Sequence, residues 1–227
     1  MPSLPPIDVY LEIGSKRTFA GALEWPGWCR SGPDPDAALA ALLDYGARYA
    51  AILQGTRLGF LAPADGTGLR VVERIRGNAT TDFGAPGIAP KSDANPVDDT
   101  ERGRFEKLLG ASWRAFDAAA LAARGKTLRT GPRGGGRSLD AIVEHVLEAD
   151  EAYLGAVGWK RPPDRGGVKE RLTQTREAIV TALGAAARGE IPAKGPRGGV
   201  RWTARYFVRR VAWHAVAHAW EIDRRAS

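Results

Sequence analysis

The 227-residue sequence is poor in the residues that build disulfide frameworks and cysteine-based metal clusters. Cys29 is its only cysteine, which excludes an internal disulfide and a cysteine zinc site. No apolar run approaches the roughly 18 residues that a membrane-spanning helix needs. Residues 1–10 (MPSLPPIDVY) lack the charged and apolar regions of a signal peptide. We therefore expect a cytoplasmic protein that does not enter the membrane.

Common catalytic motifs are also missing. The sequence has no Walker loop, no dinucleotide-binding fingerprint and no G-x-S-x-G nucleophile elbow. Cys29 has no neighbouring histidine and no CxxC partner, so we do not expect a catalytic thiol there. Histidine is scarce as well, and its three positions (145, 214 and 218) become the centre of the functional argument.

The net charge of +7 is concentrated in the second half of the chain. Residues 1–97 hold 9 basic and 10 acidic side chains, whereas residues 98–227 hold 24 and 16. A basic half can attract anionic ligands. The excess of arginine over lysine, together with abundant alanine, glycine and proline, is typical of GC-rich genomes. The charge is therefore no argument for nucleic-acid binding, which we do not expect.

The first part of the chain predicts a small α/β module. Residues 7–13 and 18–23 are rich in β-formers and read as a hairpin, and residues 69–76 read as a further strand. Residues 24–32 are expected to be extended. A helix is predicted at about residues 36–53, after an N-cap at Asp34.

From Val97 onward the pattern becomes helical. Amphipathic segments predict four helices, at about residues 99–124, 138–157, 164–188 and 203–224. Their short or glycine-rich links favour an antiparallel, up-down-up-down bundle. The expected fold class is thus α+β, with a ββαβ module at residues 1–85, a linker at 86–98 and a four-helix bundle at 99–227.

The links of the bundle contain an internal repeat. Residues 131–137 read GPRGGGR and residues 195–201 read GPRGGVR, and each copy precedes a helix that carries histidine. In an up-down-up-down bundle these two helices start at the same end. Four arginines would then gather at one rim beside two helix N-termini and bind an anion: Arg133, Arg137, Arg197 and Arg201. The alternative is that these arginines are simply solvated.

The three histidines form the main candidate site. His214 and His218 are one helical turn apart, so both rings leave the same face of the last helix. His145 lies on the apolar face of the second helix, among small side chains. Three imidazoles that face the bundle core predict a divalent-metal site. The alternative is that the rings pack in the core without a metal.

Two carboxylates accompany the histidines. Glu221 follows His218 by three residues, and we expect it to accept a hydrogen bond from a ligand ring or to pair with Arg224 or Arg225. Glu148, three residues after His145, is a weaker candidate for the same role. Three neutral ligands leave the ion its charge, which lowers the pKa of a bound water or thiol. The sequence does not choose among Zn, Ni, Fe and Mn.

The beginning of the chain resembles a known module. Two strands followed by EWPGWCRSGPDPDAALAALLDYGARYAAIL resemble the HicB-like antitoxin fold over roughly 50 residues. The resemblance lies in Pro26-Gly27, Ser31-Gly32 and the helix from Asp36 to Tyr49. It implies a ββαβ fold and, in that family, neutralisation of a small RNase toxin. The alternative role is dimerisation or covering of the second domain.

Residues 98–227 resemble the DinB/YfiT-like metalloprotein superfamily. The resemblance lies in His145 on the second helix and in AWHAVAHAWEIDRR, which carries His214 and His218, on the fourth. It implies a four-helix bundle in which these three histidines hold one divalent metal. Some members of the superfamily are thiol S-transferases that use bacillithiol or mycothiol, and others are thiol-dependent maleylpyruvate isomerases.

Two functions follow from these observations. The first is a metal-dependent transferase that uses a low-molecular-weight thiol, or a hydrolase, acting on a small substrate, which would be anionic if the arginine rim binds it. The second is a non-enzymatic regulatory or antitoxin-like protein with a structural metal that binds a partner. A small-molecule ligand is expected in the first case, and a homodimer is compatible with either.

Overall fold

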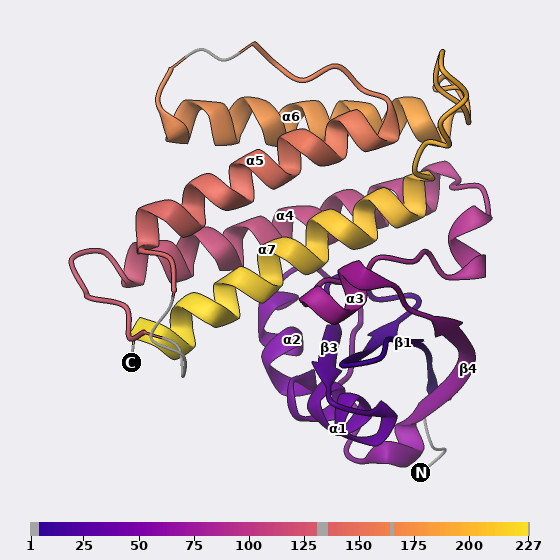
Figure 1. The fold of residues 1–227 in the computed structure, drawn as a ribbon, viewed down its shortest axis with the longest axis vertical. Coiled ribbons are helices and arrows are strands. Elements are labelled where there is room, and N and C mark those ends of the chain that lie inside the picture. The colour runs from indigo at the N-terminus through magenta and orange to yellow at the C-terminus, as the bar shows by residue number, and fades with distance from the viewer. Residues whose placement is uncertain (1–4, 131–135, 164–165, 227) are drawn as a thin grey trace. The chain divides into compact units, whose positions relative to one another are not determined.

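The computed structural model describes residues 5–130, 136–163 and 166–226. The fold is α+β, and the chain divides into two compact units, Met1–Asn95 and Pro96–Ser227 (Figure 1). The first unit holds a four-stranded sheet and short helices, and the second is built from long helices. Within the described residues, no helix is both long enough and apolar enough to cross a bilayer.

The sheet of the first unit is mixed. Its strands are β1 (Ile7–Ile13), β2 (Thr18–Ala22), β3 (Cys29–Gly32) and β4 (Leu69–Arg76), in the order β3-β2-β1-β4. β1 pairs antiparallel with β2 and parallel with β4. The predicted strands are confirmed. The segment expected only to be extended adds β3, antiparallel to β2.

The predicted helix at 36–53 is divided in two. α1 (Pro35–Asp44) starts at Asp34, whose carboxylate accepts from Ala37 N, and α2 (Gly46–Ile52) follows after a break at Tyr45. The break turns α2 so that Tyr49 reaches the core, where its hydroxyl donates to Pro26 O. The Trp28 indole stacks on Tyr49 and donates to Leu42 O. The Pro-Gly segment is therefore part of the hydrophobic core.

Residues expected to form a loop and linker belong to the first unit. α3 (Ala79–Phe83) is closed by a capping box between Asn78 and Thr81. The carboxylate of Glu12, fully buried on β1, accepts from Thr81 Oγ1 at 2.5 Å, Gly87 N at 2.8 Å and Ile88 N at 3.2 Å. This buried charge fastens the segment to the sheet.

The second unit contains the four predicted long helices. They are α4 (Asp99–Ala122), α5 (Leu139–Val157), α6 (Val168–Ala187) and α7 (Ala204–Ala226). Asp98 caps α4 and Ser138 caps α5 through side-chain oxygens, as expected for N-cap residues. Most of α7 is buried, and it packs against each of the other three helices.

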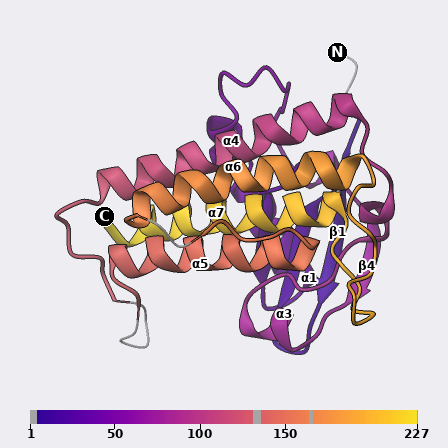
Figure 2. The ribbon, with the colours of Figure 1, turned by 90° about the horizontal axis from the view of Figure 1, so that it is seen from above.

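The predicted up-down-up-down order is wrong. α4 and α7 run in one direction, and α5 and α6 run in the other (Figures 1 and 2). Glu101 in the first turn of α4 pairs with Arg205 in the first turn of α7, so these helices are parallel. Trp202 N, just before α7, donates to Ala156 O at the end of α5, so those two are antiparallel.

The length of one connection explains the error. Ten residues join the end of α5 to the start of α6, which is about 33 Å of extended chain. The 19 residues of α5 span about 28 Å. The connection is therefore long enough to return along the helix, and the short-link argument for antiparallel neighbours does not apply to this pair.

Candidate metal centre

The predicted histidines meet between α5 and α7. His214 Nε2 lies 3.3 Å from His145 Nε2 and 3.1 Å from His218 Nε2. All three candidate ligand atoms lie within 4.8 Å of one another. His214 is buried, whereas His145 and His218 are partly exposed. One side of the cluster is thus closed by the helices, and the other is within reach of solvent.

This arrangement fits a metal ion. Imidazole nitrogens bind zinc at about 2.0–2.1 Å. At that distance, separations of 3.1 and 3.3 Å correspond to nitrogen–metal–nitrogen angles of roughly 95–110°. Such angles suit neighbouring ligands of a tetrahedral or octahedral ion. The candidate ligand atoms of the third pair, His145 and His218, lie within 4.8 Å of each other, and their approach on metal binding would complete a three-ligand site with the remaining positions open.

A chain of hydrogen bonds orients His218. Its Nδ1 lies 2.8 Å from Glu221 Oε2, and Glu221 Oε1 accepts from Arg225 Nη1 at 2.8 Å. Arg225 is buried and also donates to Arg129 O and Arg137 O. In the neutral ring Nδ1 carries the proton and donates a hydrogen bond to Glu221, so the Nε2 lone pair faces the other histidines. Glu221 thus both orients the ring and pairs with arginine.

The other carboxylate, Glu148, acts on the cluster only through its charge, which opposes the lowering of the pKa of His145. Glu148 is exposed, and within the described residues no hydrogen bond joins it to His145. The expectation that Glu148 orients His145 is therefore not met. His214 contributes a different feature, because its buried Nδ1 has no hydrogen-bond partner in the part of the chain that the structure describes.

Burial keeps the inner rings neutral. It lowers the pKa of His214 well below its usual value, and repulsion from a neighbouring ring whenever that ring is protonated, and from Arg210 and Arg137, acts in the same direction. The pKa of His145 is lowered by burial and then by Arg137. The hydrogen bond from His218 and the charge of Arg225 lower the pKa of Glu221 to about 2. Neutral rings beside an ionised carboxylate are the protonation states that metal binding needs.

The predicted arginine rim is wrong, because α5 and α7 start at opposite ends of the unit. Arg137 lies at the C-terminal end of α7, where its carbonyl accepts from Arg225. Arg201 lies at the other end, beside the C-cap of α5: a Cβ added to Gly158 would be 2.4 Å from Arg201 Nε. Arg197 is exposed in the same loop as Arg201, and Arg133 lies outside the described residues.

A different arginine stands beside the histidines. Arg210 is buried one turn before His214, and its Nη2 donates to Tyr153 Oη at 3.1 Å. Its guanidinium lies 5.0 Å from the Trp213 ring and 5.3 Å from the Tyr153 ring. Tyr153 in turn has its ring 5.8 Å from that of His214.

Arg210 was not among the predicted site residues. The signal in the sequence was its spacing of four from His214, the same spacing that joins His214 to His218. Its positive charge and that of Arg137 both lower the pKa of His214. Arg137, from the first copy of the repeat, and Arg210, from α7, are thus the arginines whose charges act on His214.

Comparisons with protein-family models, with curated proteins and with solved structures find no match. Function is therefore inferred from the geometry of the histidine cluster and its surroundings.

Proposed function

We propose that the second unit binds one divalent metal ion through the Nε2 atoms of His145, His214 and His218. The observation that carries the proposal is the convergence of these three atoms from two helices. Core histidines without a metal would be expected to use their ring nitrogens in hydrogen bonds to other groups. Here they face one another, and the one carboxylate in contact holds the outer nitrogen of His218.

We further propose that the unit is DinB-like and uses this centre for catalysis. A bound divalent ion would supply Lewis acidity and would lower the pKa of a water or thiol at an open position. Glu221 and Arg225 hold His218 in place. The nearby Arg137 and Arg210 favour a small anionic substrate, and the walls from Tyr153 and Trp213 limit the access of water. A thiol-dependent transferase or a hydrolase fits these features.

Metal analysis tests the first step. Protein purified without a histidine tag is expected to contain about one divalent ion per chain, measured by mass spectrometry of the elements. The paired substitution His214→Ala and His218→Ala removes two of three ligands and should abolish stoichiometric binding. The matched control is Glu148→Ala, an exposed neighbour of the cluster that leaves all three rings intact. Full metal content in the double variant would refute the site.

A spectroscopic experiment tests the open positions. Protein loaded with Co²⁺ is titrated with a small thiol, with 2-mercaptoethanol as the probe. Binding of the thiolate at an open position should add a charge-transfer band and shift the visible bands. A spectrum unchanged by thiol and by azide indicates a filled site, which would refute the catalytic proposal.

The second candidate function is a regulatory, partner-binding protein with a structural metal. One observation favours it. A cavity of about 520 Å³ in this unit lies on the other side of α5 and has no histidine among its lining residues, so it provides no substrate space beside the metal. A filled coordination sphere in the cobalt experiment would select this function. The HicB-like module would then be the proposed site of partner binding.

A further inference from the structure

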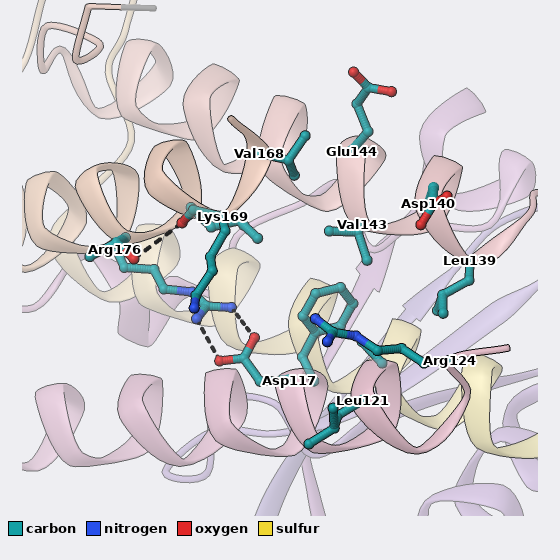
Figure 3. Close-up of a pocket in the computed structure, with 14 residues that line it drawn as sticks. Asp117, Leu121, Arg124, Leu139, Asp140, Val143, Glu144, Val168, Lys169 and Arg176 are labelled. Atoms are coloured by element: carbon teal, nitrogen blue, oxygen red, sulfur yellow. Dashed lines mark hydrogen bonds and ion pairs between the residues drawn. The ribbon is translucent and has the colours of Figure 1, made fainter. Parts of the chain in front are cut away.

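The cavity in the second unit is a feature that the proposed metal chemistry does not use. It has a volume of about 520 Å³ and lies where the end of α4 meets the first turns of α5 and α6 (Figure 3). That volume is in the range of small-molecule sites. Val143 lines it, and Val143 precedes His145 by two residues, about 200° around the helix. The cavity and the histidines therefore lie on opposite sides of α5.

The inner wall of the cavity is apolar. Phe116 and Ala120 come from α4, Leu139 and Val143 from α5, and Leu172 from α6. Leu121, also in the lining, keeps 62% of its surface exposed. Val168, a second lining residue, is 36% exposed, so two large apolar side chains stay accessible at this one cavity and form an apolar surface suited to an apolar ligand.

Charged groups stand around this wall, and one pair of them is already neutralised. Arg176 donates to both carboxylate oxygens of Asp117, at 2.7 Å each. The two remaining cations, Arg124 and Lys169, have side chains with no hydrogen bond or ion pair within the described part of the chain. Arg124 extends into the space between the helices from the turn after α4, and Lys169 extends into it from α6 (Figure 3).

The two remaining acids do not offset these cations inside the cavity. Glu144 points away from the other labelled side chains (Figure 3). Asp140 lies in the first turn of α5, where the positive end of the helix dipole stabilises a carboxylate. The cavity therefore combines an apolar wall with two exposed cations at its mouth that have no side-chain partner among the described residues.

We propose that this cavity is a second ligand site, and that it takes a small carboxylate with an apolar body. The apolar part packs between Ala120, Val143 and Leu172. The carboxylate accepts hydrogen bonds from Arg124 and Lys169 at the mouth. This site is independent of the metal centre and of any reaction there.

Three probes of equal chain length and different charge test the proposal: octanoate, octan-1-ol and octylammonium. Each is titrated into the full-length protein treated with a chelator, and binding is followed by amide NMR. Octanoate should bind the most tightly and should shift the amide signals of the residues that line the cavity. Arg124→Gln should weaken octanoate about fivefold and leave octanol unchanged, because it removes one charge-assisted hydrogen bond.

Two further variants complete the experiment. Lys107→Gln removes a positive charge from an exposed position on α4 outside the cavity and should not change octanoate binding. Ala120→Phe fills the cavity and should weaken octanoate and octanol together, with folding checked by circular dichroism. Arg124 is exposed, so its variant remains informative if Ala120→Phe fails to fold.

The remaining outcomes overturn the proposal. Tighter binding of octylammonium, equal binding of all three probes, or no binding would each do so. Loss of octanoate binding in His214→Ala, with Arg124→Gln unchanged, would place the carboxylate at the histidines instead. Failure of the metal analysis has no bearing on these results, because the titrations use metal-free protein.

Discussion

Each of the two units buries a polar cluster, and the two clusters differ in how completely their hydrogen bonds are satisfied. In the first unit, the Glu12 carboxylate accepts from Thr81, Gly87 and Ile88. In the second, three ring nitrogens face one another, and His214 Nδ1 has no partner. A buried group whose partners come from the same fold holds that fold together, whereas ring nitrogens that contact mainly one another are suited to bind a group from outside.

The largest expected effect is on the satisfied cluster. Glu12→Ala removes the acceptor of three buried donors and should lower the free energy of unfolding by about 3 kcal/mol. Urea unfolding followed by tryptophan fluorescence measures it. The control is Glu73→Ala, because the partly exposed Glu73 carboxylate accepts only from Lys91 N among its described contacts. Equal losses of unfolding free energy in both variants would show that the buried hydrogen bonds of Glu12 contribute no more to stability than the partly exposed ones of Glu73.

The next largest effect concerns the orientation of His218. Glu221→Gln weakens the acceptor for its Nδ1 proton and the partner of Arg225, so metal affinity should fall about 10- to 100-fold. Competition with a chromophoric chelator measures the dissociation constant. Asp223→Asn on the exposed side of α7 is the matched control. An unchanged metal affinity in Glu221→Gln would show that this carboxylate does not contribute to metal binding.

Acid should affect the second cluster in a predictable direction. The pKa values of His145 and His214 are lowered in the folded protein, so below about pH 6.5 the unfolded chain binds more protons. Stability of the metal-free protein is therefore full above that pH and falls as the pH drops, by about 1 kcal/mol per unit for each ring. Unfolding measured from pH 7.5 to 5 tests this, and in His214→Leu the slope should be smaller. A slope unchanged by that substitution would contradict the assignment.

The smallest expected effect is on the stability of the metal-free protein when His214 is replaced. In metal-free protein at pH 7.5, His214→Leu replaces a buried ring with an unpartnered nitrogen by an apolar side chain. The free energy of unfolding should change by less than about 1 kcal/mol, because the loss of the two ring–ring contacts is offset by removal of the buried Nδ1 that has no partner among the described residues. With metal present, the wild-type protein should gain stability that the variant does not. A large loss without metal would make His214 a structural residue like Glu12.

Much of the local structure was predictable from sequence. The strands at 7–13 and 69–76 and the N-caps at Asp34 and Ser138 were found because alternation and capping are properties of neighbouring residues. The break at Tyr45 was not found, since it depends on how Tyr49 packs against Trp28. The attachment of the segment after Asn78 was missed because its main acceptor, Glu12, lies far away in the sequence.

The site was predicted in part for the same reason. His214, His218 and Glu221 lie within two turns of one helix, so their common face follows from helix geometry. Their meeting with His145 required a judgement about which helices are neighbours, and here the expectation agreed with the structure. To place the arginines, the direction of each helix had to be known as well, and the short links predicted the wrong helix directions.

The strands β1, β2 and β4, the four long helices and the inward face of the histidines follow from the sequence alone, and a single cysteine excludes an internal disulfide. Only the tertiary structure decided that α5 and α6 are parallel, that the two glycine-arginine loops lie at opposite ends, and that Arg210 stands beside the histidines. The physical reason is that periodicity and capping are local. The direction of a helix in a bundle is set instead by the packing of residues far apart in the chain.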